Sequence, residues 1–144
     1  MPSLAPRPAE SIDPRLPVPD RSGEIPLDAT LAAGLQALVA QARATETPFE
    51  AAIAPAEQAA AAAGARDSES WITAQQALSG AIAARYPTTR ALGDLDALSA
   101  ARLKERGFIA PRDLAAIREA AEAIAAIDSR QAARVDAVQA RLGG

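Results

Sequence analysis

The residue types that most often carry catalysis or bind metal are scarce in this chain. It contains no histidine and no cysteine, which excludes disulfides, thiol nucleophiles, histidine general bases and the usual zinc ligand sets. A serine nucleophile therefore lacks a histidine partner, and only a serine–lysine pair with Lys104 is formally available. Gly-rich phosphate loops and nucleophile elbows are also missing from the sequence.

The remaining candidates for chemistry are carboxylates in the C-terminal half of the chain. The pattern forces no two of them into an apolar pocket, which acid–base catalysis would require. Metal sites built from carboxylates on facing helices usually add histidine as well. We therefore expect a protein that is not an enzyme and that holds no cofactor and no metal. The carboxylates are Asp94, Asp96, Glu105, Asp113, Glu119, Glu122, Asp128 and Asp136.

Two polar residues, Asp128 and Gln131, fall on an apolar stripe near the end of the chain. The stripe advances by steps of three and four residues, which is the heptad pattern of a helix that packs along one seam. A polar residue in such a seam either lies at its rim or forms a buried layer. The stripe consists of Leu114, Ile117, Ala121, Ile124, Asp128, Gln131, Val135, Val138 and Leu142.

Three interpretations of these polar residues are open. In the first, the stripe drifts, Ile127 takes the core position, and both polar residues lie at the rim. In the second, they form a buried polar layer that fixes the register of the helices, together with an arginine such as Arg130 or Arg134. In the third, the C-terminal half projects beyond the bundle and presents its last apolar residues, Val135, Val138 and Leu142, to a partner helix.

The N-terminal segment 1–26 differs in composition from the rest of the chain. It holds seven of the eleven prolines, which remove amide donors and restrain the preceding residues, so it cannot be a helix. We predict an extended, Pro-rich leader over 1–26 and a helical domain over 27–144. The leader is either a disordered end, or a tether or a peptide that docks on another surface, including that of its own domain.

The helical domain begins with an arm that ends near Gly64. Apolar residues from Leu27 to Ala42 lie on one helical face, and Asp28 or Thr30 can cap its start. Thr47-Pro48-Phe49-Glu50 forms a capping box with proline at the first helical position, which predicts a new helix or a kink there. Pro55 adds a second perturbation, and Gly64 is the expected C-terminal cap.

Two further arms follow, over 68–106 and 111–142. Asp67 or Ser68 caps the second arm, which we expect to run through Pro87 as one kinked helix. Gly107 is its C-terminal cap, with Phe108 packing back on the last turn. The third arm begins near Pro111 with Asp113 in its first turn, and at ~1.5 Å per residue it is about 50 Å long.

Arms of similar length joined by short connections must be antiparallel neighbours. The predicted fold is all-α, an elongated antiparallel three-helix bundle with its arms kinked at prolines and an extended leader. Large side chains are too few to fill three wide seams, so alanines such as Ala59 to Ala63 let the helices approach closely. Trp71, one turn into the second arm, is expected to close this thin end of the bundle.

Charge and hydropathy exclude two classes of function. The formal charge of −3 gives no electrostatic case for binding nucleic acid. No run of about 18 apolar residues exists, so no transmembrane segment is expected. The first residues show no signal peptide, which fits either a cytoplasmic protein or a chain in which Met1 replaces a removed signal.

The leader PSLAPRPAESIDPRLPVPD and the Ala-rich helical body together resemble small uncharacterised envelope lipoproteins of Gram-negative bacteria. In those proteins a lipidated cysteine is followed by a Pro-rich tether and a helical domain. The cysteine is absent here, so the resemblance implies that Met1 stands in its place. It also implies a lipid anchor in the native form and a location in the periplasm, at the inner face of the outer membrane.

A shorter match lies near the C-terminus. Arg134-Val135-Asp136-Ala137-Val138-Gln139 is similar to the R-x-D-x-x-Q motif of accessory lipoproteins of the outer-membrane barrel-assembly machinery. This resemblance implies that Arg134, Asp136 and Gln139 contact a partner subunit. On a helix, however, Arg134 and Asp136 point about 200° apart, so they cannot form one contact surface there.

The expected function is therefore a tethered, non-enzymatic envelope protein that acts as a spacer or adaptor through contacts with a protein partner. One alternative is a cytoplasmic helical module for interaction or assembly. Another is a small-ligand binder that uses a pocket between helices near Trp71 and Tyr86.

Overall fold

A computed structural model describes residues 17–143 of the chain, and every regular element in this range is helical. A short 3-10 helix, η2 (Ser22–Glu24), precedes α1 (Ala29–Arg43) and α2 (Glu46–Ala61). The two long helices are α3 (Glu69–Arg106) and α4 (Pro111–Gly143). The predicted leader falls largely in residues 1–16, which lie outside the described range.

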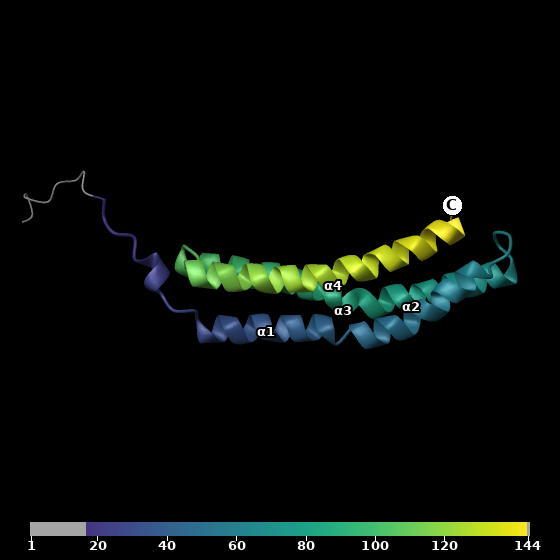
Figure 1. Ribbon diagram of the computed structural model, residues 1–144, viewed down its shortest axis with the longest axis horizontal. Helices are drawn as coiled ribbons and strands as arrows, with labels where there is room; N and C mark the ends of the chain where they lie inside the picture. Colours follow the sequence, from purple (N-terminus) through teal and green to yellow (C-terminus); the bar gives the residue numbers. More distant parts are fainter. Residues whose placement is uncertain (1–16, 144) are drawn as a thin grey trace, which may run out of the picture.

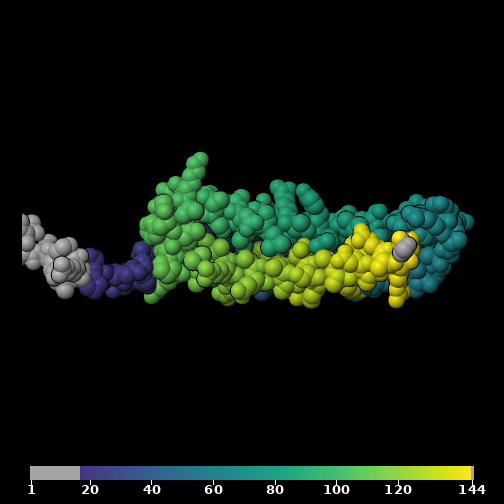
Figure 2. All heavy atoms as spheres, turned by 90° about the horizontal axis from the view of Figure 1, so that it is seen from above, coloured from purple at the N-terminus to yellow at the C-terminus, as the bar shows by residue number. Residues whose placement is uncertain are grey.

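The helices form a long bundle of three rods (Figure 1). α1 and α2 follow one another in the first rod, α3 runs back along them, and α4 returns in the direction of α1. Figure 2 shows α3 and α4 side by side along the length of the bundle. The predicted all-α, antiparallel three-rod fold is confirmed.

Three predicted caps are present. The Asp28 carboxylate accepts a hydrogen bond from the Leu31 N–H at 2.8 Å and begins α1. Ser68 Oγ accepts from the Trp71 N–H at 3.3 Å and begins α3. Gly107 ends α3 with a φ of 75°, a left-handed conformation that glycine adopts without strain.

The capping box predicted at Thr47 is wrong. α2 begins at Glu46, two residues earlier, because Ala44 and Thr45 keep helical dihedrals and the chain turns only slightly between α1 and α2. Glu50 is therefore free to pair with Arg134 of α4.

The C-terminal cap predicted at Gly64 is also wrong. α2 ends at Ala61 with Ala62 as its cap, and Gly64 lies beyond it without a positive φ. The Gly64 N–H instead donates to Ser70 Oγ at 2.9 Å. Phe108, which follows the cap of α3, is about half exposed.

Proline does not end either helix that contains it. Pro55 lies inside α2 and Pro87 inside α3, and α3 continues for 38 residues as the single helix expected. Next to the lost amide, Gln41 Nε2 of α1 donates to the Pro87 carbonyl at 3.2 Å and ties the two rods together there.

The core is thin and rich in alanine. Eight of the twenty buried apolar residues are alanines, so the helix axes can approach closely. All of these residues except Ala110 form two separate clusters. The first core cluster, in the half near the leader, contains Leu31, Leu35, Ala42, Ala91, Leu95, Ile117, Ala120, Ile124 and Ile127. The second core cluster contains Phe49, Ile53, Ala56, Ala60, Ala74, Leu78, Ala81, Val135, Val138 and Leu142.

The seam of α4 differs from the predicted heptad stripe at three positions. The residues Asp113, Ala120 and Ile127 are buried in place of Leu114, Ala121 and Asp128. Gln131 lies four residues after Ile127 and four residues before Val135. These two equal steps move the seam out of the phase of a strict heptad. The buried positions from Asp113 to Leu142 therefore recur about every 3.6 residues, as in a straight helix.

Trp71 lies at the end of the bundle farthest from the leader, as predicted, but it is only partly buried. Its ring packs against the second core cluster, and its indole Nε1 donates to the Leu142 carbonyl at 2.8 Å. The ring thus holds the last turn of α4 against the start of α3.

We expect Trp71→Ala to lower the free energy of unfolding by roughly 2–4 kcal/mol, since the ring is partly rather than fully buried. Trp71→Phe keeps most of the ring contact but loses the hydrogen bond, so it should cost about 1 kcal/mol. Urea unfolding followed by circular dichroism measures both. Ile72→Ala, at an exposed neighbour, is the control, and equal losses for all three variants would contradict this role of the ring.

Candidate functional site

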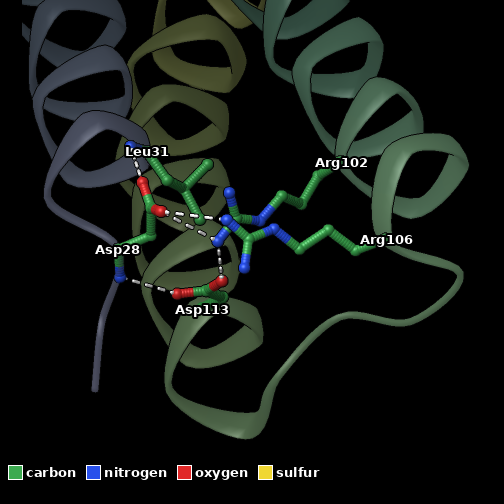
Figure 3. A network of polar contacts seen from close by, with 5 residues as sticks. All are labelled: Asp28, Leu31, Arg102, Arg106 and Asp113. Atoms are coloured by element: carbon green, nitrogen blue, oxygen red, sulfur yellow. Dashed lines mark hydrogen bonds and ion pairs between the residues drawn. The ribbon is translucent and has the colours of Figure 1, made fainter. Parts of the chain in front are cut away.

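A cluster of charged residues joins all three rods at the end near the leader (Figure 3). Arg102 of α3 donates from Nη2 to Asp113 Oδ2 at 2.6 Å and lies 3.3 Å from Asp28 Oδ2. Arg106 Nη2 lies 3.5 Å from the same Asp28 oxygen. The Asp28 N–H donates to Asp113 Oδ1 at 3.1 Å. We call Asp28, Arg102, Arg106 and Asp113 the N-terminal ion cluster.

The electrostatics of this cluster favour the charged forms. The hydrogen bond from the Leu31 N–H, with the two arginines adding to it, lowers the pKa of Asp28 below its usual value. The hydrogen bond to Asp113 raises the pKa of Arg102. Asp113 itself is buried, and a buried carboxylate requires a partner such as Arg102. The cluster therefore stabilises the end of the bundle as long as its carboxylates are ionised.

A second polar group lies at the middle of the rod, between the two core clusters. Thr45, Thr88 and Gln131 are each at most 3% exposed and come from the three different rods. Gln131 Nε2 donates to Thr45 Oγ1 at 2.9 Å, and the hydroxyls of Thr45 and Thr88 lie 2.7 Å apart. We call these three residues the central polar layer.

The Thr45 hydroxyl is the centre of this layer. It donates to the Ala42 carbonyl at 2.6 Å, which uses its one proton, so it must accept from both Gln131 and Thr88. The hydroxyl thus has its full set of partners. Gln131 Oε1, in contrast, is buried without a hydrogen-bond partner among residues 17–143.

Asp128 lies beside the central polar layer rather than in it. It is about a quarter exposed, pairs with Arg85 Nη2 of α3 at 2.7 Å, and accepts from Thr89 Oγ1 at 3.2 Å. The interpretation with both polar residues at the rim is therefore right for Asp128 and wrong for Gln131. The interpretation with a buried layer is right for Gln131, but its partners are threonines rather than Arg130 or Arg134.

Arg134, expected at a partner contact, instead bridges α2 and α4. Its Nε and Nη2 donate to the two oxygens of Glu57 at 2.8 Å each, and its Nη1 pairs with Glu50. The hydrogen bond from Arg134 lowers the pKa of Glu57. These contacts occupy the guanidinium, whereas Asp136 and Gln139 are exposed on other faces of α4.

The C-terminal half of α4 does not project beyond the bundle. Val135, Val138 and Leu142 are all buried in the second core cluster, which rules out the interpretation that presents them to a partner helix. The reason is that α2 and the start of α3 extend the other two rods to the same length as α4.

Sequence reasoning missed seven residues of these polar groups: Thr45, Glu57, Thr89, Arg106, Thr88, Arg85 and Arg102. A signal for the last three exists in α3. Leu78 and Ala81 are buried positions of α3. A step of four residues from Ala81 reaches Arg85, and a further step of three reaches Thr88, so polar residues occupy the next seam positions. Thr45 carries a similar signal, because steps of three and four residues from Ala42 reach Thr45 and then Phe49, so Thr45 continues the buried face between α1 and α2.

Trp71 and Tyr86 do not line a common pocket. They lie fifteen residues apart on α3, which corresponds to about 22 Å along the axis. Tyr86 is 63% exposed, whereas the Trp71 ring packs on the second core cluster.

A groove lies between α1 and α4. It has a volume of about 750 Å³ and is lined mainly by apolar side chains of both helices. Leu35 and Ala120 form part of its floor, and Arg43 and Glu119 lie along it. We call it the α1/α4 groove.

Residues 17–143 contain no group of three or more carboxylates placed to hold a metal ion. None of the helices in this range has a stretch long and apolar enough to cross a membrane. Comparison of the chain with family models, with curated proteins and with solved structures finds no match.

The N-terminal ion cluster predicts how stability depends on pH. Because the pKa of Asp28 is lower in the folded than in the unfolded protein, its stabilisation is complete above the unfolded value of about 3.9. The stabilisation by Asp28 is lost as the pH falls from about 3.9 through the lower pKa that Asp28 has in the folded protein. Glu57 acts in the same direction from its unfolded value of about 4.3.

We expect the melting temperature to fall below pH ~4.5, and Asp28→Asn to flatten this fall because asparagine keeps the helix cap without the charge. Thermal unfolding from pH ~7 to ~2 measures the slope. Asp136→Asn, which removes the same charge from an exposed position, is the control. An acid slope in D28N as steep as in the unchanged protein would contradict the prediction.

The central polar layer predicts an asymmetry between single and combined substitutions. Thr45→Val leaves Gln131 Nε2 and the Thr88 hydroxyl unpaired, so it should lower the free energy of unfolding by roughly 2–3 kcal/mol. The triple change T45V/T88V/Q131L removes all the polar partners together and should cost less than T45V alone. Denaturant titration measures both values.

Thr47→Val is the matched control, since Thr47 is exposed at the start of the same helix. A loss in T45V no greater than in T47V would show that the layer does not hold the rods.

Proposed function

We propose that the protein is a non-catalytic spacer or adaptor of the cell envelope, tethered through its Pro-rich leader and acting through protein contacts. The observation that carries this proposal is the way the rods are fixed to one another. Polar contacts join all three rods at the N-terminal ion cluster and at the central polar layer. The Trp71 hydrogen bond joins α3 and α4 at the far end.

The topology supports a spacing role. Because the bundle has an odd number of rods, the start of α1 and the end of α4 lie at opposite ends (Figure 1). α4 alone spans about 50 Å. A partner held near the end of α4 would therefore stand at a set distance from whatever anchors the leader.

A rigid rod predicts a single, narrow distance between its ends. Spin labels on Ala62→Cys and Ala101→Cys, both at exposed positions, should lie about 50 Å apart. The absence of native cysteines makes this pair of labels specific. Double electron–electron resonance measures the distance and its spread.

The control pair is Ala83→Cys with Ala101→Cys, which lie in one helix and report the width that the labels themselves contribute. A distribution for the pair Ala62/Ala101 that is much broader than this control, or that has two maxima, would rule out a rigid spacer.

The location in the envelope has its own test. The product of the native gene, expressed in its own cells with a C-terminal tag, should fractionate with membranes and incorporate a labelled fatty acid. Recovery in the cytosolic fraction without lipid would favour the alternative, a cytoplasmic assembly module.

A further inference from the structure

The outer surface of the first rod differs from that of the third. α1 carries a single charged residue, Arg43, in fifteen positions, whereas α4 carries ten charged residues in thirty-three. The exposed positions along the surface of α1 include Ala33, Ala37 and Ala40, and the exposed Ala44 follows directly after the helix. Surface helices are usually charged on the face away from the core, so the face of α1 beside the α1/α4 groove has the composition of a contact surface.

We propose that the α1/α4 groove binds the α1 helix of a second copy of this chain, in an antiparallel dimer with twofold symmetry. In this arrangement each α1 lies in the groove of the other copy, and the interface is the same patch on both subunits. The small side chains on the outer face of α1 allow the two helix axes to approach to about 8 Å.

The charges beside the groove select a second copy in this orientation. Asp28 contacts Asp113, and Thr45 contacts Gln131, at sequence separations of 85 and 86 residues. Because α1 and α4 run in the same direction, these separations place Glu119 at the same level along the bundle as residue 33 or 34 of α1. Arg43 lies about 14 Å farther along the rod. A twofold axis midway between them, near Leu38, brings each Arg43 opposite Glu119 of the partner copy.

Both side chains are available for this contact. Arg43 and Glu119 are exposed, and neither forms an ion pair with another residue between 17 and 143. A parallel dimer would instead place each Arg43 beside the other Arg43. Opposite charges thus favour the antiparallel orientation, and like charges disfavour the parallel one.

Sedimentation equilibrium of the full chain tests the dimer directly. We expect concentration-dependent dimers, and Arg43→Glu or Glu119→Arg should each weaken the dimer about tenfold or more, because two attractive pairs become repulsive. The combined variant R43E/E119R reverses both charges and should recover most of the affinity. The effect of R43E should shrink in ~1 M salt, where exposed charges are screened.

A single cysteine near the symmetry axis tests the orientation. Ala40→Cys should form a disulfide between two copies under mild oxidation, since antiparallel copies place the two Cα atoms within reach of each other. Ala97→Cys, at an exposed position of α3, is the control and should stay monomeric. Circular dichroism of each variant confirms that the bundle is folded.

A chain that stays monomeric at high concentration overturns the proposal and leaves the groove to a helix of another protein. A dimer that R43E does not weaken, that the combined variant does not restore, or that cross-links at Ala97→Cys as readily as at Ala40→Cys also overturns it. The dimer and the spacer role fail separately, because the label distance of about 50 Å is measured within one chain. A rigid monomer would keep the spacer and exclude the dimer.

Discussion

The bundle depends on the hydrogen bonds of one hydroxyl group, that of Thr45. Helices that touch through methyl groups have smooth surfaces and can slide past one another with little change in packing. α3 shows this most clearly, because most of its buried apolar residues are alanines. The Thr45 hydroxyl accepts from Gln131 and from Thr88, so it sets the position of each rod along the others. Burying polar groups costs stability, and the best-attested benefit is that it fixes the register of the helices.

The same constraint explains why the core is divided. A polar layer across all three rods interrupts the apolar contacts, and it does so where α1 gives way to α2. The chain keeps helical dihedrals at Ala44 and Thr45, so the Thr45 side chain lies on the buried face that continues from Ala42 to Phe49. The two consecutive steps of four residues in α4 occur at the same level and bring Gln131 to meet it. The interruption of one helix and the change of phase in another are therefore parts of a single arrangement.

Much of the fold could be predicted from local patterns. The apolar periodicity, the capping residues Asp28 and Ser68, and Gly107 gave the number of rods and most of their ends. Two failures, the capping box at Thr47 and the strict heptad of α4, depend on contacts between rods. Thr47 and Glu50 have the spacing of a capping box, but Glu50 pairs with Arg134, eighty-four residues away. A strict heptad placed Asp128 in the seam, and only packing against the other rods shows that Ile127 takes that place.

The period of the α4 seam also governs how a protein of this design can change length. At 3.6 residues per turn, seven residues fall about 20° short of two turns and 11 residues pass three turns by about 20°, whereas 18 residues make five full turns. Insertions of 18 residues, made in all three rods at once, would lengthen the bundle without rotating its groove or its polar layers. Lineages that stretch or shorten this scaffold should therefore do so in whole sets of five turns.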